Sequence, residues 1–337
     1  MKKILKLNLI LFLLLSLFVL DAGAAAKLKP ADYNYAAFHY KMTVGFKISD
    51  KATEEIIIRR NVPRSFEHQS IKNEKLSCRV PGNLILLDNK YNRYIEYNSK
   101  LKDYLDYCHK NGTNPYDTIE ISYECDYVGF KTNELVKEKY PFRFYKVKPE
   151  VEIALKNKLM SILNIAVLPY YTNETELKGD LYGGLAKVFE YVNKNVLYTR
   201  QKQKRDIITT LNSMNGNCIS KTNLWRAFIG IMGIKSCNVT CIIMSRKNKN
   251  VTHRISLGRI GGKAVPFCPT NKHFALLPAH YMVLSFVKKD NYACGIKKSE
   301  SVFDITPVKR GMDLEEVEEE ILGEDANVME TEILGEY

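Results

Sequence analysis

NGNCISKTNLWRAFIGIMGI, residues 215–234, is the stretch on which the predicted fold of this chain depends. Its apolar side chains recur at helical spacing and fall on one face: Leu224, Phe228 and Ile231. The spacing predicts a helix from Cys218 to Met232, and Gly233 is placed to end it in the left-handed conformation. The sequence therefore predicts a buried helix whose first residue is a cysteine.

The position of Cys218 favours a reactive thiol. At a helix N-terminus, unpaired backbone N–H groups and the positive end of the helix dipole stabilise a thiolate. Gly216 and Asn217, directly before it, permit the sharp turn that such a start requires. A nucleophilic cysteine also needs a base, and His253, inside a predicted strand, can supply one. The alternatives are a half-cystine or buried thiol at Cys218 and an ordinary packed histidine at His253.

These segments resemble the transglutaminase-like superfamily, whose members have a papain-like cysteine fold. The family pattern has a Gly-x-Cys helix start, a Gly-Ile pair at the end of that helix, and a histidine on a later strand. The matching residues here are Gly216-Asn-Cys218, Gly233-Ile234 and His253, and the resemblance covers roughly residues 150–275. It implies that Cys218 is the nucleophile and His253 the general base of an acyl-transfer site.

The third position of the family pattern differs in this chain. Where the family has an aspartate before Pro-Thr, this sequence has Cys268-Pro269-Thr270. A carboxylate fixes the tautomer of the catalytic imidazole and stabilises its charged form, which a neutral thiol does poorly. Asn271 could take over the orienting role through its amide, as an alternative to Cys268. Cys268 could otherwise have a core or disulfide role.

An α+β fold in two parts is predicted. Residues 35–148 form a β-rich, sandwich-like domain, because short alternating or β-branched runs are separated by turn signals. These runs are Lys41–Ile48, Glu55–Arg59, Leu84–Leu87, Tyr94–Tyr97 and Ile119–Tyr127. The region from Asn61 to Tyr97, with Gln69 and the stretch ending at Asn92, is similar to the β domain that precedes this core in exported bacterial members.

Residues 150–310 are predicted to form the transglutaminase-like core, in which helices pack on an antiparallel sheet. Besides the helix at Cys218, helical spacing covers Val151–Leu163, Leu181–Val196 and Ile207–Met214. The expected strands are Asn238–Met244, Thr252–Ile260, Lys263–Phe267 and Tyr281–Phe286. The sole tryptophan, Trp225, is expected in the core of the Cys218 helix.

Residues 1–24 have the plan of a secretory signal peptide. A basic start with Lys2 and Lys3 precedes an apolar run from Leu9 to Leu20, and Ala22-Gly23-Ala24 offers a cleavage site. The run is short for a membrane-spanning helix. An uncleaved N-terminal anchor is the alternative. We expect an exported protein, periplasmic or extracellular, with no transmembrane span after cleavage.

The charge of the chain is divided unevenly. Its net charge is +12, but residues 313–337 contain 11 acidic residues and no Lys or Arg, so the rest of the chain is strongly basic. A basic surface favours anionic partners such as a cell-surface polymer, while export makes nucleic acid an unexpected partner. The acidic tail contains the repeat EILGE twice, at 320–324 and 332–336. It is expected to be a solvated tail, or else a docking motif.

Two functions follow from the sequence. The first is an exported cysteine acyltransferase or peptidase that acts on a protein or peptide amide through Cys218 and His253. The second is a catalytically degenerate relative that serves as a binding or scaffolding module, because Cys268 replaces the aspartate. No cofactor is expected, and the Cys237/Cys241 pair lacks the companion ligands of a metal site.

Overall fold

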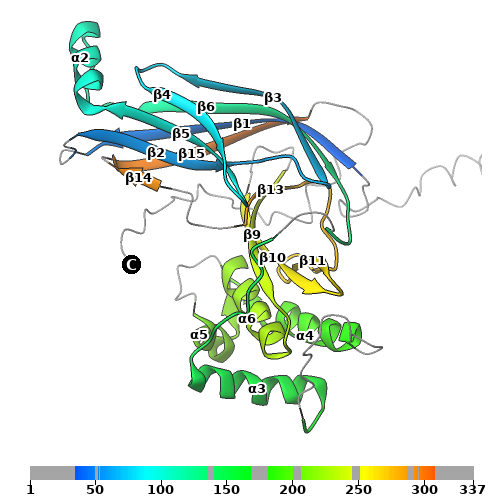
Figure 1. Ribbon diagram of the computed structural model, residues 1–337. Coiled ribbons are helices and arrows are strands. Elements are labelled where there is room, and N and C mark those ends of the chain that lie inside the picture. Colours follow the sequence, from blue (N-terminus) through cyan, green and yellow to red (C-terminus); the bar gives the residue numbers. More distant parts are fainter. Residues whose placement is uncertain are drawn as a thin grey trace, which may run out of the picture.

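The computed structural model describes residues 35–49, 52, 54–135, 140–167, 181–199, 206–244, 251–286, 292–294 and 296–307. The chain has a mixed α and β architecture with three antiparallel sheets (Figure 1). The predicted signal peptide at 1–24 and acidic tail at 313–337 lie outside the described residues. Within the described part, no helix is both long and apolar enough to cross a membrane.

Two four-stranded sheets form the first part of the molecule. One has the order β15-β1-β6-β3, and the other has the order β14-β2-β5-β4. Their bounds are β1 Tyr35–Ile48, β2 Glu55–Val62, β3 Gln69–Cys78, β4 Asn83–Asp88, β5 Arg93–Lys100, β6 Ile119–Phe130, β14 Tyr292–Cys294 and β15 Ile296–Pro307. Alternate residues of β1 and β6 are buried, and the two sheets enclose one hydrophobic core. The five predicted strand runs are all confirmed.

Four elements of this part were missed by the sequence analysis: β3, α2, β14 and β15. Strand β3 is polar along much of its length, so it gives little alternating signal. Helix α2, Leu101–Asn111, lies where only strands and turns were expected. Its buried side chains Tyr104 and Cys108 are four residues apart, and Gly112 caps it at φ 62°. The Asn111-Gly112 turn signal therefore marks the end of a helix.

The second part consists of helices followed by a five-stranded sheet. The helices are α3 Pro149–Leu163, α4 Leu181–Asn195, α5 Ile207–Ser213 and α6 Cys218–Ile231. The sheet has the order β12-β11-β10-β9-β13, with β9 Ser236–Ile243, β10 Val251–Ile260, β11 Lys263–Cys268, β12 His273–Phe274 and β13 Tyr281–Ser285. A parallel bridge joins β7, Leu197–Tyr198, to β8, Asn215–Gly216. Every helix and strand predicted for this part is confirmed within two residues at each end.

Helix α6 lies at the centre of the second part. Its side chain Trp225 is fully buried and packs against Phe189 of α4 and Phe267 of β11, with ring centroids 5.5 and 5.0 Å away. Gly233 adopts φ 85°, which confirms its role as the helix terminator. Apolar packing of Trp225 thus holds α6 against α4 on one side and against β11 of the sheet on the other.

The predicted boundary of the second part at residue 310 differs from the structure. Strand β15 pairs with β1 over eleven residues, and β14 pairs with β2. The segment 292–307 therefore completes both sheets of the first part. Residues of the other sheet also enter that core, including Met282 and Leu284 of β13. Long-range strand pairing leaves no local signal that assigns a strand to one sheet rather than another.

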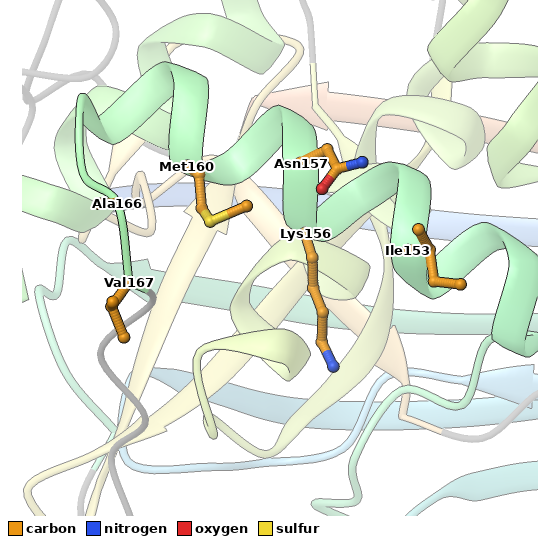
Figure 2. A pocket seen from close by; sticks show the side chains of 6 residues that line it. All are labelled: Ile153, Lys156, Asn157, Met160, Ala166 and Val167. Atoms are coloured by element: carbon orange, nitrogen blue, oxygen red, sulfur yellow. The ribbon is translucent and has the colours of Figure 1, made fainter.

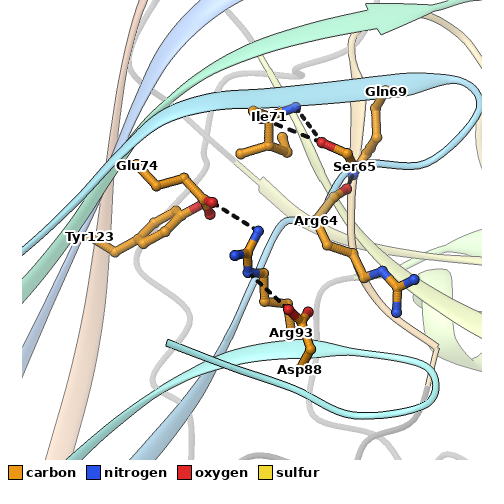
Figure 3. Close-up of polar contacts among 8 residues, drawn as sticks. All are labelled: Arg64, Ser65, Gln69, Ile71, Glu74, Asp88, Arg93 and Tyr123. Carbon is orange, nitrogen blue, oxygen red and sulfur yellow. Dashed lines mark hydrogen bonds and ion pairs between the residues drawn. The ribbon is translucent and has the colours of Figure 1, made fainter. Parts of the chain in front are cut away.

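Polar side chains of the first part hold strand β13. Gln69 Nε2 donates to the carbonyl of Val283 at 3.0 Å and to that of Arg64 at 2.8 Å. Asn92 Oδ1 accepts from the backbone N–H of Phe286 at 2.7 Å. Nearby, Arg93 forms ion pairs with Glu74 and Asp88 (Figure 3). The two parts of the chain are thus joined by specific hydrogen bonds as well as by a shared core.

Gly129 in β6 allows the first part to approach the segment before β13. A Cβ at this position would lie 2.2 Å from the carbonyl oxygen of Ala279, and the Tyr127 hydroxyl donates to the same oxygen at 2.7 Å. Because backbone atoms cannot move aside cheaply, only glycine fits here. This contact places the segment before β13 beside β6.

Candidate functional site

Cys218 is the first residue of α6, as the sequence predicts. The side chain of Asn217 caps the helix by accepting from the backbone N–H groups of Ile219 and Ser220 at 3.0 and 3.1 Å. A Cβ on Gly216 would lie 2.6 Å from Cβ of Ser220, so glycine is needed for this tight helix start. The Cys218 side chain is 5% exposed. Helix α6 therefore begins at a buried cysteine.

Three side chains tie the start of α6 to its surroundings. The Thr222 hydroxyl, one turn after Cys218, donates to the carbonyl of Arg254 at 3.0 Å, next to His253 in β10. The ammonium group of Lys221 donates to the carbonyl of Asn193 in α4 at 3.0 Å. The Asn193 amide in turn donates to the carbonyl of Pro269 at 2.7 Å. These contacts bring the helix start, β10 and the segment after β11 together.

His253 and Cys268 are in direct contact. The Nε2 atom of His253 lies 3.1 Å from the Cys268 sulfur, and both side chains are buried. The thiol found where the transglutaminase-like pattern has an aspartate therefore contacts the imidazole. Burial lowers the pKa of His253 to about 3, with further lowering from His273 and Arg254, so the ring is neutral at pH 7.

The Cys268 sulfur also contacts the backbone of the turn after β11. The backbone N–H of Asn271 donates to it at 3.4 Å. Burial raises the pKa of the Cys268 thiol to about 12, although the hydrogen bond from Asn271 opposes the rise. The thiol is therefore protonated and uncharged at pH 7.

The side chain of Asn271 does not take the orienting role that the sequence offered as an alternative. Its amide donates to the Tyr281 hydroxyl, while its backbone N–H donates to Cys268. Asn271 thus contacts the two residues, Cys268 and Tyr281, that lie against the His253 ring. The reason is the turn after β11, which folds the backbone of residue 271 back onto the sulfur.

Tyr281 was missed as a site residue by the sequence analysis. It begins β13, is fully buried, and packs edge-on against the His253 ring with centroids 6.0 Å apart. Its hydroxyl accepts a hydrogen bond from the Asn271 amide. A tyrosine in an apolar strand looks like any core residue in the sequence, so no local signal could have identified it.

Lys221 is a second site residue without a sequence-based prediction. Its side chain is 3% exposed, and burial lowers its pKa to about 8, while the nearby Cys268 sulfur raises it. A lysine is rarely buried this deeply. The one signal available was its place three residues after Cys218 in a mainly apolar helix.

The site contains a third thiol. Cys241 of β9 donates to the backbone carbonyl of His253 at 3.6 Å. Cys218 and Cys268 both raise the pKa of Cys241, after the larger effect of burial, so the three sulfurs lie within electrostatic reach of one another. All eight cysteines lie in the described part, and none of them forms a disulfide. The described residues contain no cluster of three or more His, Cys, Asp or Glu side chains suited to a metal.

A shallow pocket of about 390 Å³ lies elsewhere, along the outer face of α3. Figure 2 shows Ile153, Lys156 and Met160 of the helix around it, with Val167 from the segment that follows. None of the residues Cys218, His253 and Cys268 lines this pocket. The pocket is therefore not the site of the predicted chemistry.

Comparisons with known proteins support the fold. No protein-family profile matches the sequence, and no curated protein matches it. The structure is similar to that of a protein from Cytophaga hutchinsonii described as a candidate cysteine protease. The TM-score is 0.54 at 13% identity, and the match covers 88% of this chain and 96% of the other. At this level of identity, the likeness concerns the fold alone.

A candidate protease from Parabacteroides distasonis is a more distant match. Its TM-score is 0.30 at 10% identity, and the match covers 76% of this chain and 48% of the other. So low a TM-score carries no weight for the fold or the site.

Proposed function

We propose that the protein is an exported cysteine acyltransferase or peptidase of the transglutaminase-like, papain-like type. The observation that supports it best is the contact of 3.1 Å between His253 Nε2 and the sulfur at the third position of the family pattern. Cys218 begins α6, and Thr222 links that helix start to the backbone beside His253. The helix start that carries the thiol is thus linked to the strand that carries the imidazole, and a nucleophilic site requires such a pair together with a third group.

In the proposed reaction, the Cys218 thiolate attacks the carbonyl carbon of an amide. His253 first takes the proton of the Cys218 thiol as general base, and it gives this proton to the leaving amine when the C–N bond of the tetrahedral intermediate breaks. The backbone N–H of Cys218, at the start of α6, is placed to hold the oxyanion. The thioester is then resolved by water or by an amine, which gives hydrolysis or cross-linking.

The first test of this proposal needs no natural substrate. Iodoacetamide alkylation of Cys218 is followed by mass spectrometry of tryptic peptide 206–221, across pH 4 to 10, in wild type and His253→Ala. We expect alkylation of wild type to begin at lower pH than for free cysteine, and the variant to lose this advantage. Identical profiles in the two proteins would contradict a Cys–His pair.

The acyl acceptor is tested separately. A glutamine-containing peptide is incubated with the protein and a fluorescent primary amine, and incorporation of the amine is compared with release of ammonia and with peptide cleavage. Cys218→Ala is the control, since it removes the proposed nucleophile. Incorporation without cleavage supports a transferase, while cleavage supports a peptidase.

A binding module without catalysis is the second candidate function. It is favoured by one observation: the raised pKa of Cys268 leaves the third position uncharged at neutral pH. In this case the basic body of the chain would bind an anionic cell-surface polymer. The test measures retention of the protein on an anionic polymer at increasing salt, together with the pH profile of Cys218 alkylation. Salt-dependent retention and a profile like that of free cysteine would support the binding module. Export through residues 1–24 is proposed for either function and is tested by N-terminal sequencing of the secreted protein.

A further inference from the structure

Three chain segments lie side by side where β9 begins. The backbone groups of Arg143 exchange two hydrogen bonds with those of Ser236, at 2.9 and 3.2 Å, and the N–H of Arg259 donates to the carbonyl of Lys235 at 2.8 Å. In this antiparallel register, Phe144 and Arg259 lie on either side of Lys235. The side chains of these three residues therefore share one face of the sheet.

That face is the one turned away from α6. The Nε atom of Arg226 in α6 donates to the Ser236 hydroxyl at 3.0 Å, so Ser236 faces the helix. Because successive side chains of a strand alternate, Lys235 points to the opposite side. Tyr145 likewise packs with the helical core, which leaves its neighbour Phe144 on the outer side.

Exposed cations surround the Phe144 ring on this face. The ring is 44% exposed, and Lys235 Nζ lies 5.3 Å from its centroid. Arg259 is exposed, as is Lys146, two residues beyond the ring. We call Phe144, Lys146, Lys235 and Arg259 the basic row. An exposed ring among cations favours a partner that carries both apolar and acidic groups.

Carboxylates of the neighbouring elements bind other lysines. Glu134, beside β11, forms an ion pair with Lys263 at 2.7 Å, and Glu152 in α3 forms one with Lys156 at 2.7 Å. Within the described residues, neither Lys146 nor Lys235 forms an ion pair with a carboxylate. The positive charge of the basic row is therefore available to an anionic partner.

The acidic segment 313–337, outside the described residues, has the complementary chemistry. It contains 11 acidic residues and no Lys or Arg. Its motif EILGE, at 320–324 and again at 332–336, places an Ile-Leu pair between glutamates. An apolar pair suits the exposed ring, and the flanking carboxylates suit the cations around it.

We propose that the acidic segment docks on the basic row of its own chain through the EILGE motif, with the Ile-Leu pair against Phe144 and the glutamates against the three cations. Strand β15 ends at Pro307, 13 residues before Glu320 and 25 before Glu332. When extended, these stretches span about 45 and about 85 Å. A compact chain of this length has a radius of gyration of about 20 Å, so the tether allows docking within one chain.

This surface is separate from the candidate catalytic site. Helix α6 has 14 residues and is therefore about 21 Å long. Cys218 begins the helix, whereas Lys235 follows its other end. The inference does not rest on the proposed function, and docking at the basic row leaves Cys218 uncovered. An anionic polymer that binds this surface would compete with the acidic segment.

Carbodiimide cross-linking locates the acidic segment directly, because it joins a carboxylate to a lysine only where the two are in contact. The full chain is treated at pH 7 and its tryptic peptides are quantified by mass spectrometry; the whole segment lies in peptide 311–337. We expect links to Lys146 and Lys235 to exceed those to Lys102, an exposed lysine in α2, about fivefold at 50 mM salt. They should disappear at about 0.5 M salt, where the Debye length is about 4 Å.

A double variant tests the cations of the basic row. In Lys235→Gln/Arg259→Gln, links to Lys146 should fall about fivefold, as expected for the loss of two exposed charge contacts. The matched control is Lys102→Gln/Lys110→Gln, which removes the same charge from exposed positions in α2 and should keep these links.

Equal linking of the segment to Lys146, Lys235 and Lys102 in wild type overturns the proposal, as do equal losses in the two double variants. Should Lys235→Gln/Arg259→Gln not fold, the distribution of links in wild type decides. A mixture of ¹⁵N-labelled and unlabelled protein distinguishes the source of the segment. Links that combine labelled with unlabelled peptides would show a second copy as the donor and overturn docking within one chain.

Discussion

Gln69 of β3 binds both backbone groups of Val283 in β13, accepting from its N–H at 2.9 Å and donating to its carbonyl at 3.0 Å. The amide side chain thus takes the place of a neighbouring strand. Because Tyr281 begins the same strand, the first part of the molecule helps to position the site. A link of this kind explains how a domain that carries none of the proposed catalytic residues can affect their geometry.

Gln69→Ala is therefore expected to lower the free energy of unfolding by about 2–4 kcal/mol, because it leaves two buried backbone groups without partners. The measurement is urea denaturation at pH 7.5. Asn111→Ala is the control: its amide bonds to a carbonyl on the exposed end of α2, and we expect a loss within about 0.5 kcal/mol. Equal losses of unfolding free energy in the two variants would contradict the prediction that Gln69 stabilises the packing of β13.

Cys268→Asp restores the family residue at the third position. The carboxylate would accept from His253 Nε2 and leave the other ring nitrogen able to act as a base. We expect alkylation of Cys218 at pH 7 to become about tenfold faster, which is the gain in thiolate that one pKa unit produces. Cys268→Asn, which has the same shape without the charge, should not show this gain. An unchanged rate in Cys268→Asp argues against His253 as the partner of Cys218.

Stability is expected to fall as the pH falls below about 6.5. Burial lowers the pKa of His68, His253 and His280 to about 3 each, whereas in the unfolded chain it is about 6.5. Between these values the unfolded state binds more protons. Each histidine therefore removes about 1.4 kcal/mol of stability per pH unit as the pH drops through this range.

His280 offers the cleanest check of this slope, because both of its ring nitrogens are buried without a hydrogen-bond partner in the described structure. Urea denaturation is measured between pH 7.5 and 5 for wild type and His280→Leu. We expect the variant to have the shallower dependence on pH, by about the contribution of one histidine. His109→Gln, at an exposed position in α2, should keep the wild-type slope.

Asn217 caps the helix that begins at Cys218. Asn217→Ala is expected to cost about 1 kcal/mol of unfolding free energy, since two backbone N–H groups lose their acceptor. Asn217→Asp keeps the cap and should leave stability near that of wild type, while its negative charge slows alkylation of Cys218 by disfavouring the thiolate. The measurements are thermal unfolding and the alkylation rate. Faster alkylation in Asn217→Asp would speak against an electrostatic effect at this helix start.

The placement of the candidate site residues was predicted in part. Cys218 lies at a helix start and His253 in a strand, as expected, because nearby residues impose these local features. Cys268 was named as a candidate third member because of its place before Pro269 and Thr270. Tyr281 and Lys221 gave no comparable signal, since their roles depend on which residues lie across the fold from them.

By itself, the sequence determined the helix from Cys218 to the Gly233 terminator, the helices before it and the strands after it. Residues within a few positions of one another specify these elements through apolar spacing, capping and turn chemistry. Only the tertiary structure decided that Cys268 lies against His253 and that Tyr281 packs edge-on against the same ring. The tertiary structure also decided that β15, near the end of the described chain, pairs with β1. These contacts join residues far apart in the chain, and their energy comes from burial and pairing that exist only once the parts have packed together.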